Sequence, residues 1–274
     1  MQPFSVLMSL YIKEKPEFFD ECMKSILSNT VLPNEIVIVL DGPISDELRQ
    51  VLDKYVNDNP SLYNIVPLET NQGLGLALRE GVLHCNNELI ARMDTDDICR
   101  KDRFELQLKE FENNPDLDIC GSHIKEFQND QTNIVSVRKV PLDNKSIRNY
   151  QKKRSSFNHM TVMYKKSAVI KAGNYEHCPL MEDDLLWIKM LLSESQGCNI
   201  DDYLVDVRVG DSMIKRRGGL SYFKKYKKAR KRILKTGFIN RFQYFVSVFV
   251  QLIVSLLPIK IRKAFFKKVL RTKQ

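Results

Sequence analysis

The first third of the chain alternates short, continuous apolar runs with longer amphipathic stretches. The runs Phe4–Leu10 and Glu35–Leu40 contain few polar residues, as strands of a parallel sheet do when helices cover both faces. The same patterning predicts a strand at 63–68 and helices at 16–28, 45–57 and 73–84. Because short links join these elements, the sequence predicts an α/β fold: a Rossmann-like, mostly parallel sheet flanked by helices.

A further apolar run, within Glu88–Asp97, ends in three carboxylates: Asp94, Asp96 and Asp97. Acids crowded at the end of a buried strand repel one another and lose hydration. A divalent cation would stabilise them, because Mg²⁺ and Mn²⁺ prefer hard oxygen ligands and share them with substrate phosphates. The alternative is a solvated turn that caps the next helix, and spacing alone leaves both interpretations open.

The position of the acids favours a functional interpretation. Tyr11, Asp41 and the acids at 94–97 all follow predicted strands, and ligands of such sheets bind at the carboxyl ends of the strands. The segment Asn71–Gly75 also follows a strand and opens a helix, which is typical of dinucleotide-binding loops. Leu78 occupies the place of the third glycine, so we reject that function and expect a tight turn with close helix packing.

Beyond the acids, the sequence predicts a helix at 100–113 and strands at 118–121 and 133–140, followed by an irregular region. His159 in that region either contacts a substrate or has a structural role, and the structural role is the commoner one. The stretch Met181–Trp187 places three acids before an apolar helix whose tryptophan should anchor it in the core. Its acids are either a helix cap or include a general base, and the sequence weighs these about equally.

Composition limits the class of protein. The 274 residues, 43% of them hydrophobic, suit one large globular domain or two small ones. The six cysteines form no Cys-x-x-Cys pair and no cluster with zinc-ligand spacing, so we expect reduced thiols. The N-terminal residues lack a basic segment and a cleavage site, which favours a first strand over a signal peptide.

Charge divides the chain into two parts. From Met213 onward there are 19 of the 43 basic residues and none of the 34 acidic ones, so 24 basic residues face 34 acidic ones in the preceding part. An acidic body with a basic tail indicates an anionic partner for the tail.

The tail begins with a basic loop in which Arg216 and Arg217 have the chemistry to bind a diphosphate. A helix is expected at 219–236, then 18 uncharged residues from Phe242 to Ile259, then a last basic helix with Ile261, Phe265 and Val269 spaced by four. We favour attachment to an anionic membrane surface over a membrane span or a packing role, because 18 residues lie at the lower limit for a span. Nucleic-acid binding would not explain the uncharged block.

Assembled in order, these motifs resemble those of family 2 glycosyltransferases that build bacterial exopolysaccharide or O-antigen on a lipid carrier. The resemblance covers about residues 3–220 and rests on five segments: Ser5–Tyr11, Ile36–Gly42, Asn71–Gly75, Ile90–Asp97 and Gly173–Trp187. It implies a glycosyltransferase-A fold in residues 1–218, with a nucleotide-binding half at about 1–97 and an acceptor half at about 98–218. A basic, amphipathic helical tail would occupy residues 219–274.

The resemblance also implies roles for individual residues. Leu10 and Tyr11 would lie at the nucleobase, and Asp41 would accept its imide hydrogen. Asp94 would hold the ribose or the metal-bound phosphate, Asp96 would be the main ligand of Mn²⁺ or Mg²⁺, and Asp97 would assist it or cap the next helix. Asp183 would be the catalytic base, and Arg216 and Arg217 would close over the diphosphate.

The activity that the resemblance implies is inverting, metal-dependent transfer of a sugar from a nucleoside-diphosphate sugar, UDP-linked by expectation. The acceptor would be a hydroxyl group of a lipid-linked glycan in surface polysaccharide synthesis. The enzyme would be cytoplasmic and peripheral on the inner face of the plasma membrane, without a nucleic-acid partner; a homo-oligomer is left open. The alternatives are a nucleotidyltransferase and a catalytically inactive, membrane-associated scaffold that binds nucleotide sugars.

Overall fold

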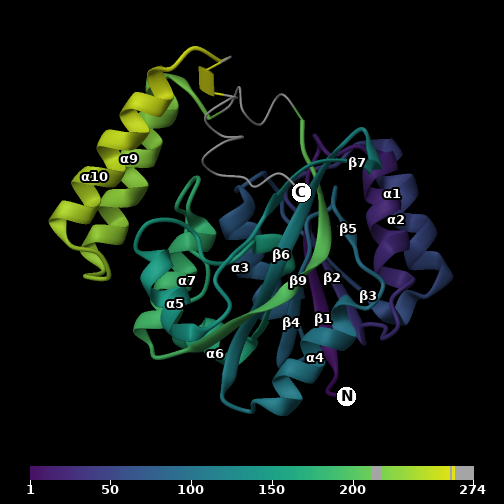
Figure 1. Ribbon diagram of the computed structural model, residues 1–274. Helices are drawn as coiled ribbons and strands as arrows, with labels where there is room; N and C mark the ends of the chain where they lie inside the picture. The colour runs from purple at the N-terminus through teal and green to yellow at the C-terminus, as the bar shows by residue number, and fades with distance from the viewer. Residues whose placement is uncertain (211–216, 260, 263–274) are drawn as a thin grey trace.

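The computed structural model describes residues 1–210, 217–259 and 261–262. One sheet with the strand order β3-β2-β1-β4-β8-β6-β9-β5 forms its centre, and β7 pairs with β6 beside this path (Figure 1). The strands of the first half are β1 (Phe4–Leu10), β2 (Glu35–Leu40), β3 (Tyr63–Pro67) and β4 (Leu89–Arg92). Those of the second half are β5 (Ile98–Cys99), β6 (Leu117–Gln128), β7 (Asp130–Arg138), β8 (Met163–Lys165) and β9 (Gln196–Arg208).

The first half of the sheet is parallel, as the apolar runs predict. Strand β1 pairs in parallel with β2 on one side and with β4 on the other, and β2 pairs in parallel with β3. The chain thus winds outward from β1 to β3 and returns to the opposite side of β1 for β4. This reversal creates a topological switch point between β1 and β4, where ligands of such sheets bind.

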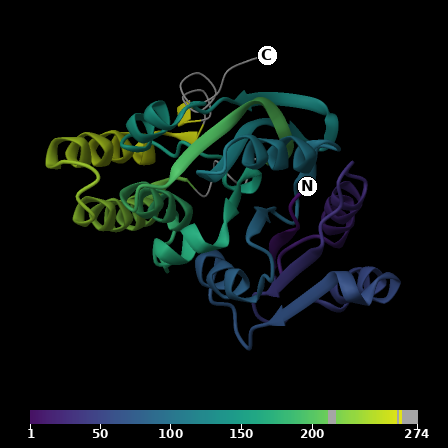
Figure 2. The same cartoon turned by 90° about the horizontal axis from the view of Figure 1, so that it is seen from below.

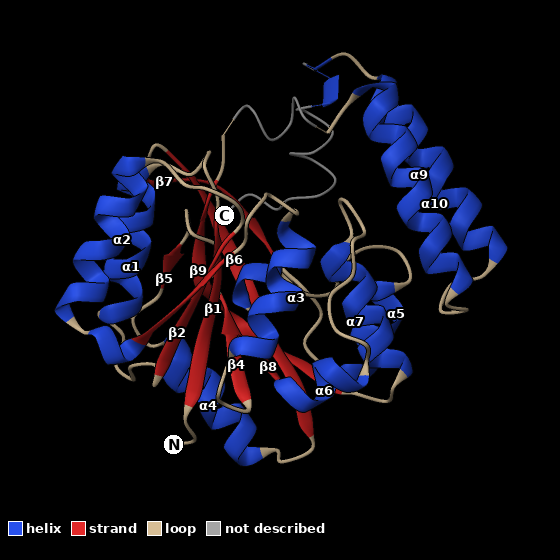
Figure 3. Ribbon diagram, turned by 180° about the vertical axis from the view of Figure 1, so that it is seen from behind, coloured by secondary structure: helices blue, strands red, loops and turns tan. Residues whose placement is uncertain are grey.

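Helices cover both faces of the sheet (Figure 3). They are α1 (Pro16–Leu27), α2 (Asp46–Asp58), α3 (Leu74–His84), α4 (Arg103–Asn113), α5 (Asn144–Gln151), α6 (Lys166–Lys171) and α7 (Glu182–Leu192). Successive residues of β1 alternate between two cores: Val6 and Met8 pack with α1, α2 and α4, whereas Leu7 packs with α3, α5, α6 and α7. Every residue of β2 is buried, so its continuous apolar run is explained by helices on both sides.

The second half of the sheet is mixed, where the regular alternation of strands and helices ends. Strand β8 is antiparallel to β4 and β6, and β7 is antiparallel to β6. The strand predicted at 118–121 extends over twelve residues as β6, and β9, which the sequence did not indicate, pairs with β6 in parallel along most of its length. The sequence of β9 contains Asn199, Asp201 and Asp202, and their partners lie far away in the sequence.

Two helices, α9 (Gly219–Lys235) and α10 (Arg241–Leu256), form a hairpin beside the α5 and α7 layer (Figures 1 and 2). The hairpin extends to the side of the molecule opposite α1 and α2 (Figure 2). The helix predicted at 219–236 is confirmed, and the uncharged block forms α10, which begins with a capping box between Asn240 and Gln243. No helix in the described part of the chain combines the length and apolar character needed to cross a bilayer. The predicted basic helix after Ile261 lies almost wholly outside the described residues.

Candidate active site

The acidic loop Asp94–Asp97 follows β4 at the switch point beside β1. Asp94 accepts a charged hydrogen bond from the guanidinium of Arg92, a fully buried side chain that also donates to the carbonyl of Met93. Burial alone would lower the pKa of Arg92, but the adjacent Asp94 carboxylate, together with Tyr175 and Tyr164, outweighs it and the pKa is raised. The guanidinium therefore remains charged and fixes the orientation of the Asp94 side chain.

The backbone of the acidic loop is held from two other segments. The thiol of Cys22 on α1 donates to the carbonyl of Asp94 at 3.2 Å. The hydroxyl of Thr95 donates to Glu14 Oε2 at 2.7 Å, so the turn after β1 is joined to the loop after β4. These contacts place Glu14 among the groups that face Asp96.

Arg208, the last residue of β9, also holds the loop, although no sequence motif marks it. Its Nε donates to the carbonyl of Asp96 at 3.1 Å, and its backbone N–H donates to Asp97 Oδ1 at 2.9 Å. The guanidinium lies over the rings of Phe18 and Phe127, 3.9 and 4.6 Å from their centroids. Cation–π contacts and hydrogen bonds together fix this guanidinium against the loop.

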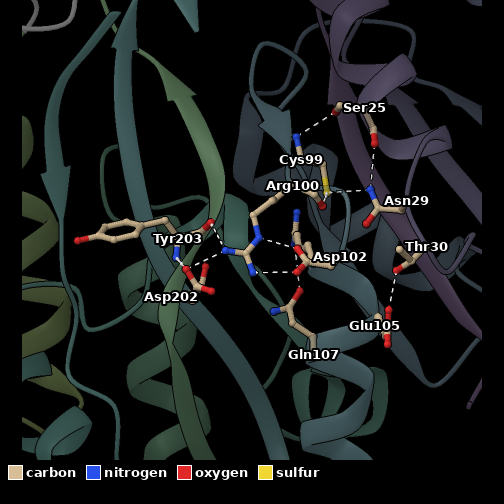
Figure 4. Close-up of polar contacts among 12 residues, drawn as sticks. Ser25, Asn29, Thr30, Cys99, Arg100, Asp102, Glu105, Gln107, Asp202 and Tyr203 are labelled. Atoms are coloured by element: carbon tan, nitrogen blue, oxygen red, sulfur yellow. Dashed lines mark hydrogen bonds and ion pairs between the residues drawn. The ribbon is translucent and has the colours of Figure 1, made fainter. Parts of the chain in front are cut away.

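The chain that leaves the acidic loop is fixed between α1 and β9 (Figure 4). The N–H of Cys99 donates to Ser25 Oγ at 2.9 Å. Arg100 forms ion pairs with Asp102 at 2.5 Å and with Asp202 of β9 at 2.7 Å. Helix α4 begins only at Arg103 and its N-cap residue is Asp102, so Asp97 does not cap this helix.

Burial and mutual repulsion disfavour the ionised form of the loop carboxylates. Burial, followed by the nearby charges of Asp94 and Glu14, raises the pKa of Asp96 to about 7. Burial, with the charges of Asp96 and Asp94, also raises the pKa of Asp97, whose Oδ2 is buried without a hydrogen-bond partner among the described residues. This is the electrostatic state that a bound cation would relieve.

The described ranges contain no group of three or more His, Cys, Asp or Glu residues arranged to hold a metal ion. The loop nevertheless fits a divalent cation, because it offers hard oxygen donors, a raised carboxylate pKa and an unpartnered buried oxygen. Mg²⁺ typically uses one or two protein carboxylates and takes its other ligands from substrate phosphates and water.

The residues expected at the nucleobase lie at the ends of β1 and β2. Tyr11 is partly exposed, with 36% of its surface accessible, whereas the side chain of Leu10 is fully buried. Asp41 is nearly buried and accepts backbone hydrogen bonds from Gln72 at 2.7 Å and from Gly73 at 3.0 Å. The carboxylate therefore orders the loop before α3, and an ionised carboxylate retains further acceptor sites for a ligand.

The glycines of Asn71–Gly75 have the structural role that we expected. Gly73 is the N-cap of α3 with φ +87°, a conformation that side chains disfavour. A Cβ on Gly75 would lie 2.9 Å from the carbonyl oxygen of Glu176 and 3.0 Å from Glu182 Cβ. The start of α3 thus packs directly against the first turn of α7.

The second acidic cluster forms the first turn of α7. Its acids are Glu182, Asp183 and Asp184, and Asp184 accepts from Gln151 Nε2 at 2.8 Å. Burial, followed by the charges of Asp184 and Glu182, raises the pKa of Asp183 well above its ordinary value, while Arg138 partly offsets the shift. Trp187 is fully buried and anchors the helix, as the sequence predicts.

A buried aromatic and cationic group lies between the two clusters. His159 Nε2 contacts the Tyr175 hydroxyl at 3.0 Å, and its ring packs edge-on against Trp187. Burial and the charge of Arg92 lower the pKa of His159 to about 3, so the imidazole is neutral and its structural interpretation fits best. The charges of Arg92 and Asp183 both act on the pKa of Tyr175. Tyr175 therefore lies near both the acidic loop and the first turn of α7.

Of the two arginines expected at the diphosphate, the described residues include only Arg217. Arg216 lies outside the described residues. Arg217 is half-buried just before α9, where its charge acts on Tyr222. Three residues that hold the acidic loop were not expected from the sequence: Arg92, Arg208 and Glu14. Of these, only Arg92 lies close to the acidic loop in the sequence, two residues before Asp94.

The chain is similar to known glycosyltransferases over most of its length. Residues 5–177 match the model of Glycosyl transferase family 2. The chain is 38% identical to amylovoran biosynthesis glycosyltransferase AmsE of Erwinia amylovora, over 97% of this chain and 98% of that one. It is also 38% identical to the UDP-Gal:alpha-D-GlcNAc-diphosphoundecaprenol beta-1,3-galactosyltransferase of Escherichia coli, over 98% and 96% of the two chains.

Solved structures share the fold at low sequence identity. S. aureus TarS 1–349 superposes with a TM-score of 0.64 at 16% identity, covering 97% of this chain and 72% of that chain. Mannosyltransferase PcManGT from Pyrobaculum calidifontis, in complex with GDP-Man and Mn²⁺, superposes with a TM-score of 0.63 at 14% identity, covering 85% and 64%. The predicted glycosyltransferase-A fold of the body is confirmed.

Proposed function

Because the chain belongs to glycosyl transferase family 2, we propose that it transfers a sugar from a nucleoside-diphosphate sugar to a lipid-linked glycan. Two near full-length relatives support this proposal, since one acts in amylovoran biosynthesis and the other is a galactosyltransferase named for a diphosphoundecaprenol-linked acceptor. The same relative uses UDP-Gal, and TarS has been solved with UDP and with UDP-GlcNAc, which favours a UDP-linked donor. We place the reaction in surface polysaccharide synthesis.

One observation carries the proposal. The carboxylates of Asp94, Asp96 and Asp97 lie at the switch point of a parallel half-sheet, where α/β proteins bind nucleotides, and a separate half-buried carboxylate begins α7. Glycosyl transfer needs both groups: one set of residues holds the leaving diphosphate, and one base activates the acceptor. A nucleotidyltransferase would need the first set but has no evident use for the second, so we favour glycosyl transfer.

Asp96, with Asp94, would hold Mn²⁺ or Mg²⁺. Such a cation supplies positive charge that stabilises a departing nucleoside diphosphate. The Mn²⁺ in the complex of the mannosyltransferase PcManGT supports this assignment. Arg92 orients the Asp94 carboxylate, and Arg208 fixes the backbone beneath Asp96.

Asp183 would act as the catalytic base. Its raised pKa makes it a stronger base than an ordinary aspartate, which suits removal of a proton from an acceptor hydroxyl group. The hydroxyl oxygen would then bond to the anomeric carbon while the bond to the diphosphate oxygen breaks on the opposite face. This single displacement inverts the anomeric configuration.

The nucleobase and the diphosphate would be bound by the remaining selected residues. The exposed ring of Tyr11 would stack near the base, with the buried Leu10 supporting it, and Asp41 would accept the imide hydrogen. Arg216 and Arg217 would close over the diphosphate. The division into a nucleotide-binding half at about 1–97 and an acceptor half at 98–218 stays a prediction, and the sheet runs continuously through both.

We place the enzyme in the cytoplasm, peripheral on the inner face of the plasma membrane, where a lipid-linked acceptor is available. The basic tail, residues 219–274, supports this placement through its charge and the absence of acidic residues. An inactive scaffold that only binds nucleotide sugars would have the same location but would not transfer the sugar.

A screen of sugar nucleotides tests the proposal. We expect one UDP-sugar to raise the melting temperature with Mn²⁺ and to release UDP when acceptor is added, and chelation by EDTA to abolish both effects. Asp96→Asn should lose the response to Mn²⁺, whereas Asp53→Asn, an exposed acid on α2, should retain it. Turnover that resists EDTA would show that the reaction does not need a divalent cation. Binding of a sugar nucleotide without turnover would favour the inactive scaffold.

A further inference from the structure

The outward face of α10 is apolar. It comprises seven exposed residues at helical spacing, which we term the apolar face: Phe242, Phe245, Val246, Phe249, Val250, Ile253 and Leu256. Its three phenylalanines are 76%, 66% and 63% exposed. Contiguous apolar surface of this kind on a soluble domain marks an interaction site.

The inward face of the same helix is more polar than the outward one. Ser247 accepts from Arg230 Nε of α9 at 3.1 Å, and Gln251 donates to Ser255 at 3.0 Å on the part-buried side. A helix that merely covers a protein core places its apolar side inward. The inward side of α10 is mixed, with Tyr244 and Val254 buried beside Ser247 and Gln251, whereas the apolar face on the outward side suits an apolar environment.

The hairpin is fixed to the catalytic body, so the apolar face has a defined orientation. Ala229 and Ile233 of α9 and Tyr244 of α10 pack with Leu185 and Ile188 of α7 in one buried cluster. Arg230 also donates to the carbonyl of Lys152 at 3.1 Å, and Arg232 pairs with Glu176. The helix that begins with the Asp183 turn is therefore the same helix that supports the hairpin.

The charge of the hairpin specifies the kind of partner. Six lysines of α9 are exposed: Lys224, Lys225, Lys227, Lys228, Lys231 and Lys235. No acidic residue occurs from Met213 to the end of the chain. An apolar face beside exposed lysines matches the boundary between acyl chains and anionic headgroups.

We propose that α10 lies in the plane of an anionic lipid leaflet, with its apolar face in the acyl boundary and the α9 lysines among the headgroups. The sixteen residues of α10 reach roughly 24 Å, less than the hydrocarbon thickness of about 30 Å. This orientation deepens the proposed function, since a hairpin packed on α7 would hold the Asp183 turn at a constant height above lipid-linked acceptors.

Flotation of the full-length protein with vesicles tests the proposal. Wild-type protein should float with vesicles that contain 30% phosphatidylglycerol and should bind pure phosphatidylcholine weakly. Phe245→Ser with Phe249→Ser should weaken binding to the anionic vesicles at least tenfold. The matched control, Leu32→Ser with Leu192→Ser, changes two apolar residues of the body that are 55% and 48% exposed and should bind as wild type does.

The charge is tested separately. Lys224→Gln, Lys228→Gln and Lys231→Gln together should weaken binding to anionic vesicles by roughly 100-fold and leave the residual binding to neutral vesicles unchanged. All variants should retain UDP release with a soluble acceptor analogue. That readout distinguishes failure of the membrane proposal from failure of the proposed glycosyl transfer.

A second measurement does not depend on how well the serine variants fold. In Phe249→Trp, the new indole should be quenched by brominated lipid acyl chains, whereas the buried Trp187 of the wild-type protein should not. Absence of quenching, or equal vesicle binding by wild type and the double serine variant, would overturn the proposal. So would a wild-type dimer that the serine variant converts to monomer without any vesicle binding, because a second copy would then cover the face.

Discussion

Among single residues, Arg208 illustrates how a distant side chain organises a local motif. The acids at 94–97 are adjacent in the sequence, so their clustering could be predicted from it. Arg208 and Glu14 reach the same loop from other elements and belong to no motif that marks them. Their role appears only when the fold brings the end of β9 and the turn after β1 to the loop that follows β4.

Replacing Arg208 with lysine tests its positioning role. Lysine keeps the charge but cannot reproduce the planar guanidinium that bonds to the Asp96 carbonyl while lying over two rings. We expect the Mn²⁺ concentration for half-maximal activity to rise roughly tenfold, the scale of losing one charge-assisted hydrogen bond. Titration of activity with Mn²⁺ measures this.

The control for Arg208→Lys is Arg148→Lys. Arg148 also donates to backbone carbonyls, those of Leu191 and Ser195, but lies on α5 away from the acidic loop. Its substitution should lower stability without changing the Mn²⁺ dependence. An unchanged Mn²⁺ dependence in Arg208→Lys would show that the guanidinium does not position the loop.

The raised pKa of Asp183 predicts the pH dependence of the reaction. A base must be deprotonated to act, so kcat/KM at saturating Mn²⁺ should rise with pH along a limb well above the ordinary aspartate range. Asp184→Asn removes one of the charges that raise this pKa and should shift the limb to lower pH. A limb that does not move in this variant would contradict the assignment of the limb to Asp183.

Among the helices and strands, those whose apolar residues form a regular local pattern could be predicted from the sequence. Strands β1 and β2 and helices α1, α3 and α9 agree closely with the apolar patterns, because helices or sheet cover their apolar sides. Strand β9 was missed because Asn199 and Asp201 interrupt its pattern. Their partners, the carbonyl of Pro141 and His123, lie far away in the chain.

The contact between α3 and α7 connects the two halves of the site, so a change at this contact should alter the position of the α7 acids. Gly75→Ala would place a methyl group against the Glu176 carbonyl and Glu182, and we expect the first turn of α7 to shift with this segment. We expect kcat to fall by on the order of 100-fold, as displacement of a reacting group by about 1 Å does. Arg79→Ala, at an exposed position on the same helix, should leave kcat unchanged.

A crystal structure of Gly75→Ala completes this test. We expect displacement of the Glu182–Asp184 turn with an intact acidic loop at 94–97. Normal kcat in a variant that folds would show that the close approach of α3 to α7 is unnecessary for the reaction.

At the scale of the whole molecule, the division of charge is already visible in the sequence, and the structure gives it a location. The acidic body holds both carboxylate clusters, whereas nine of the nineteen basic residues after Met213 lie in the hairpin that packs on α7. The sequence could predict the helices of this tail but not the inward orientation of Ser247 and Gln251. That orientation depends on contacts between α9 and α10.

We propose that the two acidic clusters have different roles in the reaction. The loop at 94–97 holds the leaving group, and Asp183 activates the acceptor. The most direct test is sugar transfer by Asp183→Asn, with the dissociation constant for the UDP-sugar measured on the same preparation. We expect a loss of transfer of roughly 10²- to 10⁴-fold, unchanged donor binding, and normal transfer by the control Asp53→Asn. Transfer at the wild-type rate by Asp183→Asn would contradict this proposal.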